Sequence, residues 1–338
     1  MPKKIVMQDI ADRLQLSKNS VSQALTGKDG VSEETRRLIM KTAQEMGYHY
    51  KGKISDRKAA PARRIGLIAS EYAFSMENFF GKIYVDVERE AQKHNFNLQI
   101  QSISPAMRDG LTLPAFLEDN KVDGLLVLSH ISTTYTERIL TERVPTVLID
   151  HHHPMLHADA VLTNNRFGAY MAVKHLLDLG HTEIGIIGNV EASPSYQERY
   201  EGYLLALREH GLEPSEPLMH ARVPEEATAI RRALEQAGDA ATAWFGMNDG
   251  FAYYVCSALH AAGRRIPEEV SICGFDHTHF SDMCHPKLTT MEIDIGQFAR
   301  KALHQLMWRM DNPDEVYQEI LLPTRLLVRD STGPVRER

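Results

Sequence analysis

The chain has 338 residues, of which 43% are hydrophobic and 25% are charged. These proportions exclude a largely disordered chain, and the length favours two or three domains. The net charge of −7 is uneven, because the first 64 residues hold 14 lysines and arginines against 7 acidic residues, which leaves −14 for the remainder. A basic end on an acidic body is typical of a protein that binds a polyanion through that end.

Two compositional features bear on location and redox chemistry. There is no run of about 18 apolar residues, and the amino terminus has no apolar secretion segment, so we expect a cytosolic protein. The cysteines Cys256, Cys273 and Cys284 are odd in number and lie in apolar stretches. They indicate neither a disulfide framework nor a metal site.

The amino-terminal segment carries three helical patterns. Apolar residues recur at helical spacing over Met7 to Leu14, Val21 to Leu25 and Leu38 to Met46. Ser17 and Ser32 precede the second and third patterns, where a hydroxyl can cap a helix. Three amphipathic helices of this size can share one small core.

The second helix presents a polar face. It needs Val21, Leu25 and part of Ala24 for the core, which leaves the other side chains outside. The outward set is Lys18, Asn19, Ser20, Ser22 and Gln23. Asparagine and glutamine can pair with adenine, lysine can reach guanine or phosphate, and serine can bond phosphate oxygens. Such a face can read a major groove, although many polar helix faces are only solvated.

The segment Val6 to Tyr48, VMQDIADRLQLSKNSVSQALTGKDGVSEETRRLIMKTAQEMGY, closely resembles the DNA-binding head of the lactose and galactose repressor family. The resemblance implies that Lys18, Asn19 and Gln23 occupy base-reading positions. It assigns the phosphate contacts to Ser17, Ser20, Ser22 and Thr26. We therefore expect an operator in double-stranded DNA as a partner.

A polar, basic linker with a breaker at Pro61 follows over residues 50–63. In the family this stretch commonly forms a hinge helix that wedges a leucine into the minor groove. Here Arg57 stands where that leucine is expected. An arginine can enter a narrow minor groove electrostatically, and a merely solvated linker is an equal alternative.

From Arg64 onward, short apolar runs alternate with longer amphipathic stretches. The runs lie at 65–69, 98–100, 125–128, 147–149, 184–187, 244–247 and 270–273. Such alternation is typical of parallel βαβ units. The expected fold is an all-α helix-turn-helix head on an α/β body of two doubly wound parallel-sheet lobes, like a periplasmic binding protein.

Ligands bind beyond the carboxyl ends of the strands in open parallel sheets. The residues that follow the apolar runs are Ser70, Ser129, Asp150, Asn189, Asn248 and Asp276. Each of them taken alone is better explained as a helix cap or a turn residue than as a ligand contact.

Four segments of the body, LLDLGHTEIGIIG, QERYEGYLLAL, WFGMNDG and EEVSICGFDHTH with PKLTT, resemble the same family in the same order. The resemblance covers nearly the whole chain. It implies effector contacts from Asp150, Arg199, Asn248 and Asp276, and a cleft lined by Phe79, Phe80 and Phe167. Arginine opposed to carboxylates suits sugar hydroxyls, and a purine or nucleoside could use the same groups.

Two departures from the family leave the effector's identity open. Leu128 and Ser129 stand near a position that is polar in some members, and His277 follows Asp276 where a second carboxylate is common. Histidines cluster at His151 to His153 and at His277 to His285, which makes a metal or an anionic effector conceivable. Because no ordered ligand spacing supports a metal, we expect neither a metal nor a cofactor.

The carboxyl-terminal strands are expected to return to both lobes, with hinges near 161–164, 291–294 and 322–325. We place the head at 1–49, the linker at 50–63 and the body at 64–338. Lobe 1 then comprises about 64–162 and 293–322, and lobe 2 about 163–292 and 323–338. Only DSTGPVRER follows Arg329, without the long helix that tetramerises some relatives, so we expect a homodimer on a pseudo-palindromic operator.

Two other classes of protein are disfavoured. A sugar-binding protein without a DNA role would share the body but would not need a basic three-helix head. An enzyme on an α/β fold is disfavoured because the motifs GxSxG, GxxxxGK[ST] and GxGxxG do not occur. The sequence therefore predicts an effector-controlled transcription regulator. We expect it to act as a repressor and to bind a sugar or sugar derivative as its effector.

Overall fold

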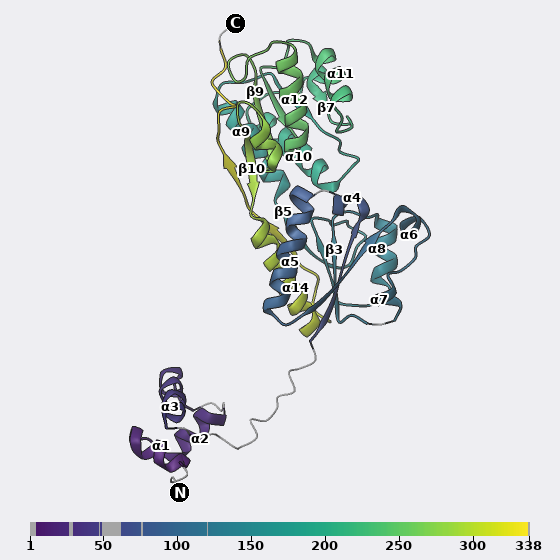
Figure 1. Cartoon of the computed structure of the whole chain (residues 1–338). Coiled ribbons are helices and arrows are strands. Elements are labelled where there is room, and N and C mark those ends of the chain that lie inside the picture. The colour runs from purple at the N-terminus through teal and green to yellow at the C-terminus, as the bar shows by residue number, and fades with distance from the viewer. Residues whose placement is uncertain are drawn as a thin grey trace. The chain divides into compact units, whose positions relative to one another are not determined.

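The computed structural model describes residues 5–26, 30–46, 48, 62–75, 77–119 and 121–336. The chain divides into two units, Met1–Ala62 and Arg63–Arg338 (Figure 1). Among the helices that are described, none is both long enough and apolar enough to cross a membrane.

The first unit contains the three predicted helices, α1 (Met7–Leu14), α2 (Lys18–Thr26) and α3 (Glu33–Glu45). Their shared core consists of Ile10, Ala11, Val21, Ala24, Ile39 and Ala43. The prediction for Leu38 is wrong, because this side chain is 50% exposed. The helical period places Ile39 and Ala43 on the inner face of α3 and turns Leu38 outward.

Local hydrogen bonds fix the ends of these helices. The turn after α1 is tight because Gln15 adopts a left-handed conformation, φ 54°. Ser17 Oγ accepts a hydrogen bond from the Ser20 amide at 3.0 Å, so Ser17 caps α2 as expected. At the other end of α2, the Arg36 guanidinium donates to the carbonyl oxygens of Gln23 and Ala24. Arg36 thus ties α3 to α2.

The second unit holds two six-stranded sheets. Sheet 1 has the order β11-β5-β4-β3-β1-β2, and its strands are all parallel to their neighbours. These strands are β1 (Arg64–Ser70), β2 (Asn97–Ile103), β3 (Gly124–Leu128), β4 (Thr146–Ile149), β5 (Asp159–Thr163) and β11 (Glu319–Leu322). Its helices are α4 (Glu71–Ser75), η1 (Glu77–Gly81), α5 (Lys82–Lys93), α6 (Pro105–Asp109), α7 (Ala115–Glu118), α8 (Thr133–Leu140) and α14 (Ile295–Asp311).

Sheet 2 has the order β12-β10-β9-β8-β6-β7, and only β12 runs antiparallel to its neighbour among the described strand pairs. Its strands are β6 (Ile184–Ile187), β7 (Met219–His220), β8 (Ala243–Gly246), β9 (Ser271–Asp276), β10 (Thr289–Ile293) and β12 (Thr324–Leu327). Its helices are α9 (Asn165–Asp178), α10 (Pro194–Glu209), η2 (Glu216–Leu218), α11 (Ala227–Ala237), α12 (Asp249–Ala261) and α13 (His279–Met283). The predicted α/β fold with two parallel-sheet lobes is confirmed.

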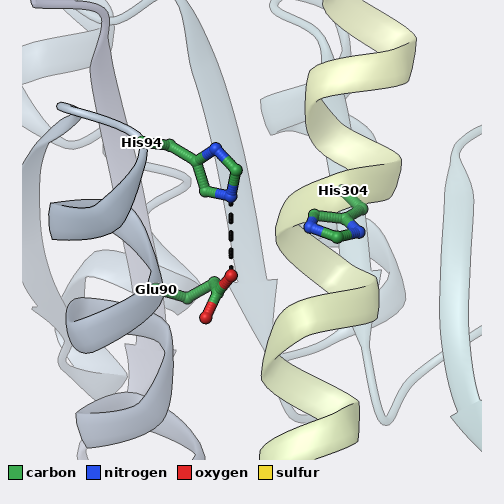
Figure 2. A group of neighbouring side chains, drawn as sticks. All are labelled: Glu90, His94 and His304. Atoms are coloured by element: carbon green, nitrogen blue, oxygen red, sulfur yellow. Dashed lines mark ion pairs between the residues drawn. The ribbon is translucent and has the colours of Figure 1, made fainter. Parts of the chain in front are cut away.

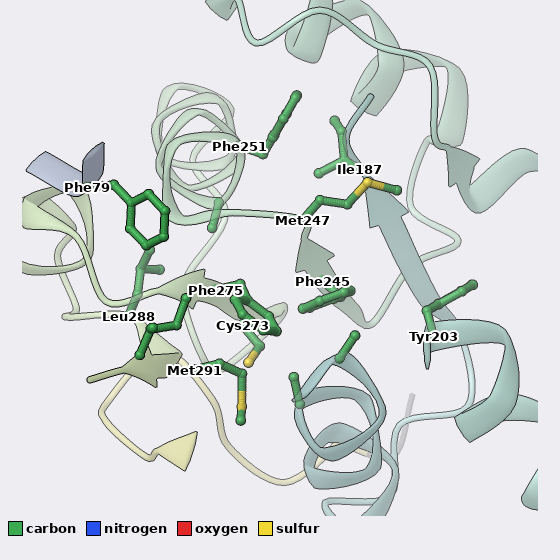
Figure 3. Packing of buried hydrophobic residues seen from close by; sticks show 14 of the residues in the cluster. Phe79, Ile187, Tyr203, Phe245, Met247, Phe251, Cys273, Phe275, Leu288 and Met291 are labelled. Carbon is green, nitrogen blue, oxygen red and sulfur yellow. The ribbon is translucent and has the colours of Figure 1, made fainter. Parts of the chain in front are cut away.

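Helices cover both faces of these sheets, which explains why strands such as β6 and β8 are buried along their whole length. Figure 3 shows the core of sheet 2, where Phe245, Cys273 and Phe275 from β8 and β9 lie together. Helices α9 and α10 approach closely because residue 202 is a glycine, whose Cβ would overlap the carbonyl oxygen of Arg166. This packing positions α10, which carries Arg199 in its second turn.

The chain passes between the two sheets three times: after β5, after β10 and between β11 and β12. The first two passages end in helix caps. Asn164 Oδ1 accepts from the Phe167 amide at 3.4 Å, and Asp294 Oδ1 accepts from the Gln297 amide at 2.9 Å. These crossings bring the carboxyl ends of both sets of strands to one cavity.

Candidate ligand cavity and DNA-binding helix

The polar residues predicted on α2 lie on its accessible side. Ser17, Lys18 and Asn19 are exposed, and Ser20, Ser22 and Gln23 are partly exposed. The Ser17 and Ser20 hydroxyls also share a hydrogen bond of 2.8 Å. Thr26 is the last residue of α2. Arg57 lies outside the described residues.

A cavity of about 380 Å³ lies between the two sheets of the second unit. It is lined by Phe79, Phe80, Ser129, His130, Asp150, Ala192, Ser193, Ser195, Tyr196, Arg199, Glu225, Asn248, Asp249, Gly250, Asp276, Thr278, His279 and Phe280. Sheet 1 contributes the residues that follow β3 and β4, and sheet 2 contributes those at the ends of β8 and β9. This is the location expected for a ligand in an open parallel sheet.

Seven of the ten candidate residues for the effector site line this cavity, and Ser70, Phe167 and Asn189 do not. Ser70 instead accepts a hydrogen bond from the Ala73 amide at 3.2 Å, as a cap does. Phe167 lies in the first turn of α9 with 54% of its surface exposed. The exposure shows that its side chain is on the outer face of the helix.

Backbone strain concentrates at the strand ends. Ser129, Asp150 and Asp276 have φ values of 65°, 57° and 96°, in the left-handed region that L-residues rarely adopt. All three line the cavity. Non-glycine residues persist in this conformation where the surrounding structure holds them, and such residues are common at ligand sites. The strained residues therefore stand at the ends of three separate strands and line one cavity.

Arg199 lines the cavity and is held in place by several contacts. Its side chain is 3% exposed and forms an ion pair with Asp276, with 2.7 Å between Nη2 and Oδ1. Nε donates to Asn165 Oδ1 at 2.9 Å, and Nη1 donates to the Met247 carbonyl oxygen at 2.6 Å. The guanidinium also lies 3.8 Å from the ring centre of Phe275. These contacts set its orientation before any ligand arrives.

Asp150 is buried opposite this arginine, and its Oδ1 has no hydrogen-bond partner among the described residues. Burial raises its pKa to about 7, while Arg199 lowers it and the neighbouring carboxylates Asp276 and Glu198 raise it. A buried oxygen without a partner is costly, so this atom is available to a ligand hydroxyl.

Sequence reasoning missed several cavity residues. Two of them contact Asn248, which was predicted. Asn248 Oδ1 accepts from the Phe251 amide at 2.8 Å and so caps α12, and Asn248 Nδ2 donates to Tyr196 Oη and Glu225 Oε2. Tyr196 and Glu225 were not singled out, although Tyr196 lies one residue before the QERYEGY segment. Gly250 leaves room for this position of the Glu225 carboxylate, because a Cβ there would overlap Oε1 unless the side chain moved.

Asp249 was also missed, although it stands in the quoted segment WFGMNDG. It is fully buried and accepts hydrogen bonds from Thr290 Oγ1 at 2.6 Å and from the Thr278 amide at 2.6 Å. Burial raises its pKa to about 8. Because Asp249 joins α12, β10 and the loop after β9, it supports the cavity wall.

The histidines near the cavity have separate environments. Burial lowers the pKa of His151 to about 3, and both of its ring nitrogens lack partners in the described structure. His152 bridges Glu198 and Glu319 at 2.6 and 3.0 Å, and these carboxylates raise its pKa to about 9. His277 contacts Glu292 and Arg329. Within the described residues, these clusters provide no group of three metal-ligating side chains.

The first unit is a small helical domain with a polar helix face, and the second encloses a ligand-sized cavity between two sheets. This combination defines the class of DNA-binding regulators that a ligand controls. Residues 6–50 match the model for "Bacterial regulatory proteins, lacI family", and residues 173–332 match a "Periplasmic binding protein-like domain". The chain belongs to the lacI family of bacterial regulatory proteins and is a DNA-binding transcription regulator. The predicted family and function are confirmed.

Three relatives document this membership. The ribose operon repressor of Haemophilus influenzae is 30% identical, over 96% of this chain and 98% of its own. The HTH-type transcriptional regulator DegA of Bacillus subtilis is 29% identical, over 98% and 99%. A crystal structure of a LacI family transcriptional regulator from Enterococcus faecium with bound ribose has a TM-score of 0.68 and 27% identity, and the match covers 81% of this chain and 100% of that one.

Proposed function

We propose that the chain is a repressor whose affinity for its operator is set by a neutral, polyhydroxylated small molecule, a sugar or sugar derivative, in the cavity around Arg199. The observation that carries the proposal is the opposition of Arg199 to the carboxyl groups of Asp150 and Asp276 inside a wall of aromatic rings. A nucleoside is the second candidate, because it offers the same pair of hydroxyls on a ribose ring.

The hydrogen-bonding groups suit a vicinal diol. A guanidinium has five N–H donors, and three hydrogen bonds to described residues occupy Arg199. The remaining donors can reach ligand oxygens, while Asp150 Oδ1 accepts from a ligand hydroxyl. Phe79, Phe80 and Phe280 supply apolar surface for the face of a sugar ring. Together these groups fix a ring in both position and orientation.

The charge of the cavity argues against an anionic effector. The described lining residues include four carboxyl groups, Asp150, Glu225, Asp249 and Asp276, and one arginine, Arg199, which already pairs with Asp276. Burial lowers the pKa of His130, so this imidazole adds no compensating charge at neutral pH. A phosphate or uronate would therefore lose its hydration without gaining, among the described lining residues, an arginine or lysine that is free of a carboxylate partner. We expect neutral sugars to bind in preference to their phosphate esters.

We further propose that two copies bind a pseudo-palindromic operator, with Lys18, Asn19 and Gln23 reading bases and the serines of α2 contacting phosphates. The head, linker and body keep the bounds 1–49, 50–63 and 64–338. Closure of the two lobes about the three chain crossings would change the spacing of the heads, and a coupling of about 1–3 kcal/mol suffices to switch occupancy. A regulator of this kind binds its effector without turnover and acts in the cytoplasm, where the DNA is.

The test is isothermal titration calorimetry of the full-length protein with a panel of neutral sugars, nucleosides and their phosphate esters. We expect one neutral ligand to bind, and its phosphate ester to bind at least about tenfold more weakly, a difference of about 1.4 kcal/mol. Asp150→Asn should weaken binding, whereas Asp314→Asn, which alters an exposed carboxylate, should not. Tighter binding of a phosphate ester than of its parent sugar would contradict the proposed charge selectivity.

A further inference from the structure

A carboxylate and two imidazoles meet at the carboxyl-terminal end of α5, away from the ligand cavity. Glu90 lies in the last turn of α5 and His94 is its C-cap residue, so the two are four residues apart and share a helix face. His304 lies on α14, which packs against α5. Figure 2 shows the His94 ring above the Glu90 carboxylate at the end of α5, and the His304 ring beside them on the facing helix α14.

The ligand atoms have nearly the spacing that a metal ion requires. One oxygen of Glu90 and one nitrogen from each histidine lie within 4.8 Å of one another. Zinc bonds of about 2.1 Å at tetrahedral angles place two ligand atoms about 3.4 Å apart. The distance from His94 Nε2 to Glu90 Oε1 is already 3.5 Å. His304 would have to approach by no more than about 1.4 Å, and its exposed side chain has room to do so.

The electrostatic setting of Glu90 favours a cation at this point. Its side chain is 9% exposed and stands at the carbonyl end of α5, where the helix dipole disfavours an anion. Lys93 donates to Oε2 at 2.7 Å from a side chain that is 58% exposed. The other oxygen, Oε1, faces His94. The lysine therefore occupies one oxygen of the carboxylate and leaves Oε1, the oxygen that faces His94, for a metal.

We propose that Glu90, His94 and His304 bind a first-row transition-metal dication, with Zn²⁺ as the representative ion. Two imidazole nitrogens and one carboxylate oxygen suit Zn²⁺, Co²⁺, Ni²⁺ or Cu²⁺, whereas Ca²⁺ and Mg²⁺ prefer oxygen ligands alone. Three protein ligands leave a coordination position for water. The bound ion joins α5 to α14 across lobe 1, at the end of α5 opposite η1 with its cavity residues Phe79 and Phe80.

This site is invisible to a search for ligand spacing along one segment. The pair Glu90 and His94 has helical spacing, but the third ligand comes from α14, far along the chain. The packing of α14 against α5 is what brings His304 to the pair. The histidine clusters that the sequence does display, after β4 and β9, are engaged with carboxylates or buried separately.

The test is calorimetric titration of metal-free, full-length protein with zinc chloride. The chain has 16 histidines, so weak background binding is expected and the variants carry the argument. We expect one zinc ion per chain at the tightest site. His304→Ala and Glu90→Gln should each weaken that site at least about tenfold, and His157→Ala, which removes an exposed histidine elsewhere, should leave it unchanged. Calcium chloride should give no such site.

A second readout separates loss of the site from loss of the fold. Zinc should raise the melting temperature of the wild type and of His157→Ala, and it should not raise that of His304→Ala, whose circular dichroism should match the wild type because His304 is exposed. The proposal is overturned if His304→Ala and Glu90→Gln bind zinc as tightly as His157→Ala, or if the wild type shows only background binding.

Discussion

Replacing Asp150 by asparagine should stabilise the protein at alkaline pH and have much less effect at acid pH. The carboxyl is buried, and its pKa is raised from 3.8 to about 7 in the folded protein. Well below pH 3.8 it is protonated in both the folded and the unfolded state, so it carries no ionisation cost. As the pH rises, the unfolded chain ionises first and the folded state loses stability until the folded carboxyl ionises near pH 7.

The magnitude follows from the size of that shift. Each pKa unit corresponds to about 1.4 kcal/mol, so a shift of about three units removes about 4 kcal/mol of stability above pH 7. Asparagine does not ionise and escapes this cost. The gain from Asp150→Asn should therefore be about 3 kcal/mol larger at pH 8 than at pH 4.5, where most of the cost has disappeared.

Urea denaturation of the wild type and Asp150→Asn at pH 4.5 and pH 8 measures this difference, and Asp314→Asn serves as the exposed control. The same variant should lose affinity for the effector, so function and stability should move in opposite directions. The reasoning is refuted if the free energies of unfolding of Asp150→Asn and wild type differ by the same amount at both pH values. That result would show that Asp150 is ionised in the folded protein at pH 4.5 as well as at pH 8.

Three further outcomes follow from the described contacts. Arg309→Met breaks the buried pair of Arg309 with Asp159, with 2.6 Å between Nε and Oδ2, and should lower the free energy of unfolding by about 3–5 kcal/mol; a loss below about 1 kcal/mol in urea would contradict a structural role. Ser129→Gly relieves a φ of 65° and should raise the free energy of unfolding by about 1 kcal/mol, seen as a higher melting temperature. A lower melting temperature would show that the conformation is not strained. Asn19→Ala should weaken specific operator binding by about 1–3 kcal/mol in fluorescence anisotropy, with nonspecific binding preserved; equal losses on both kinds of DNA would exclude base reading.

The head was predictable because its determinants are local. Helical periodicity and the hydroxyl of Ser17 fix α2 within a dozen residues, and the burial of Val21 and Ala24 agrees with that pattern. Leu38 shows the limit of the pattern, since adjacent apolar residues on α3 cannot both face a core this small. The three helices bury Ile39 and Ala43 on that face, with Met46 partly buried beside them, and leave Leu38 outside.

The cavity was predictable at the strand ends and not elsewhere. The geometry of a parallel sheet brings Ser129, Asp150 and Asp276 to one edge whatever the intervening loops do. Glu225 reaches the cavity from an irregular segment before α11, and its approach depends on the glycine at position 250, which no local pattern announces. The outward orientation of Phe167 is likewise decided by how α9 packs.

The central claim is that a small molecule in the cavity controls the affinity for DNA. Fluorescence anisotropy of full-length protein, titrated into an operator selected from a pool of pseudo-palindromic duplexes, tests it with and without a neutral sugar that calorimetry has identified. The account predicts that the sugar changes the dissociation constant by about 5- to 150-fold in the wild type and leaves it nearly unchanged in Asp150→Asn. The same operator affinity with and without a sugar that binds the wild-type cavity would contradict the account.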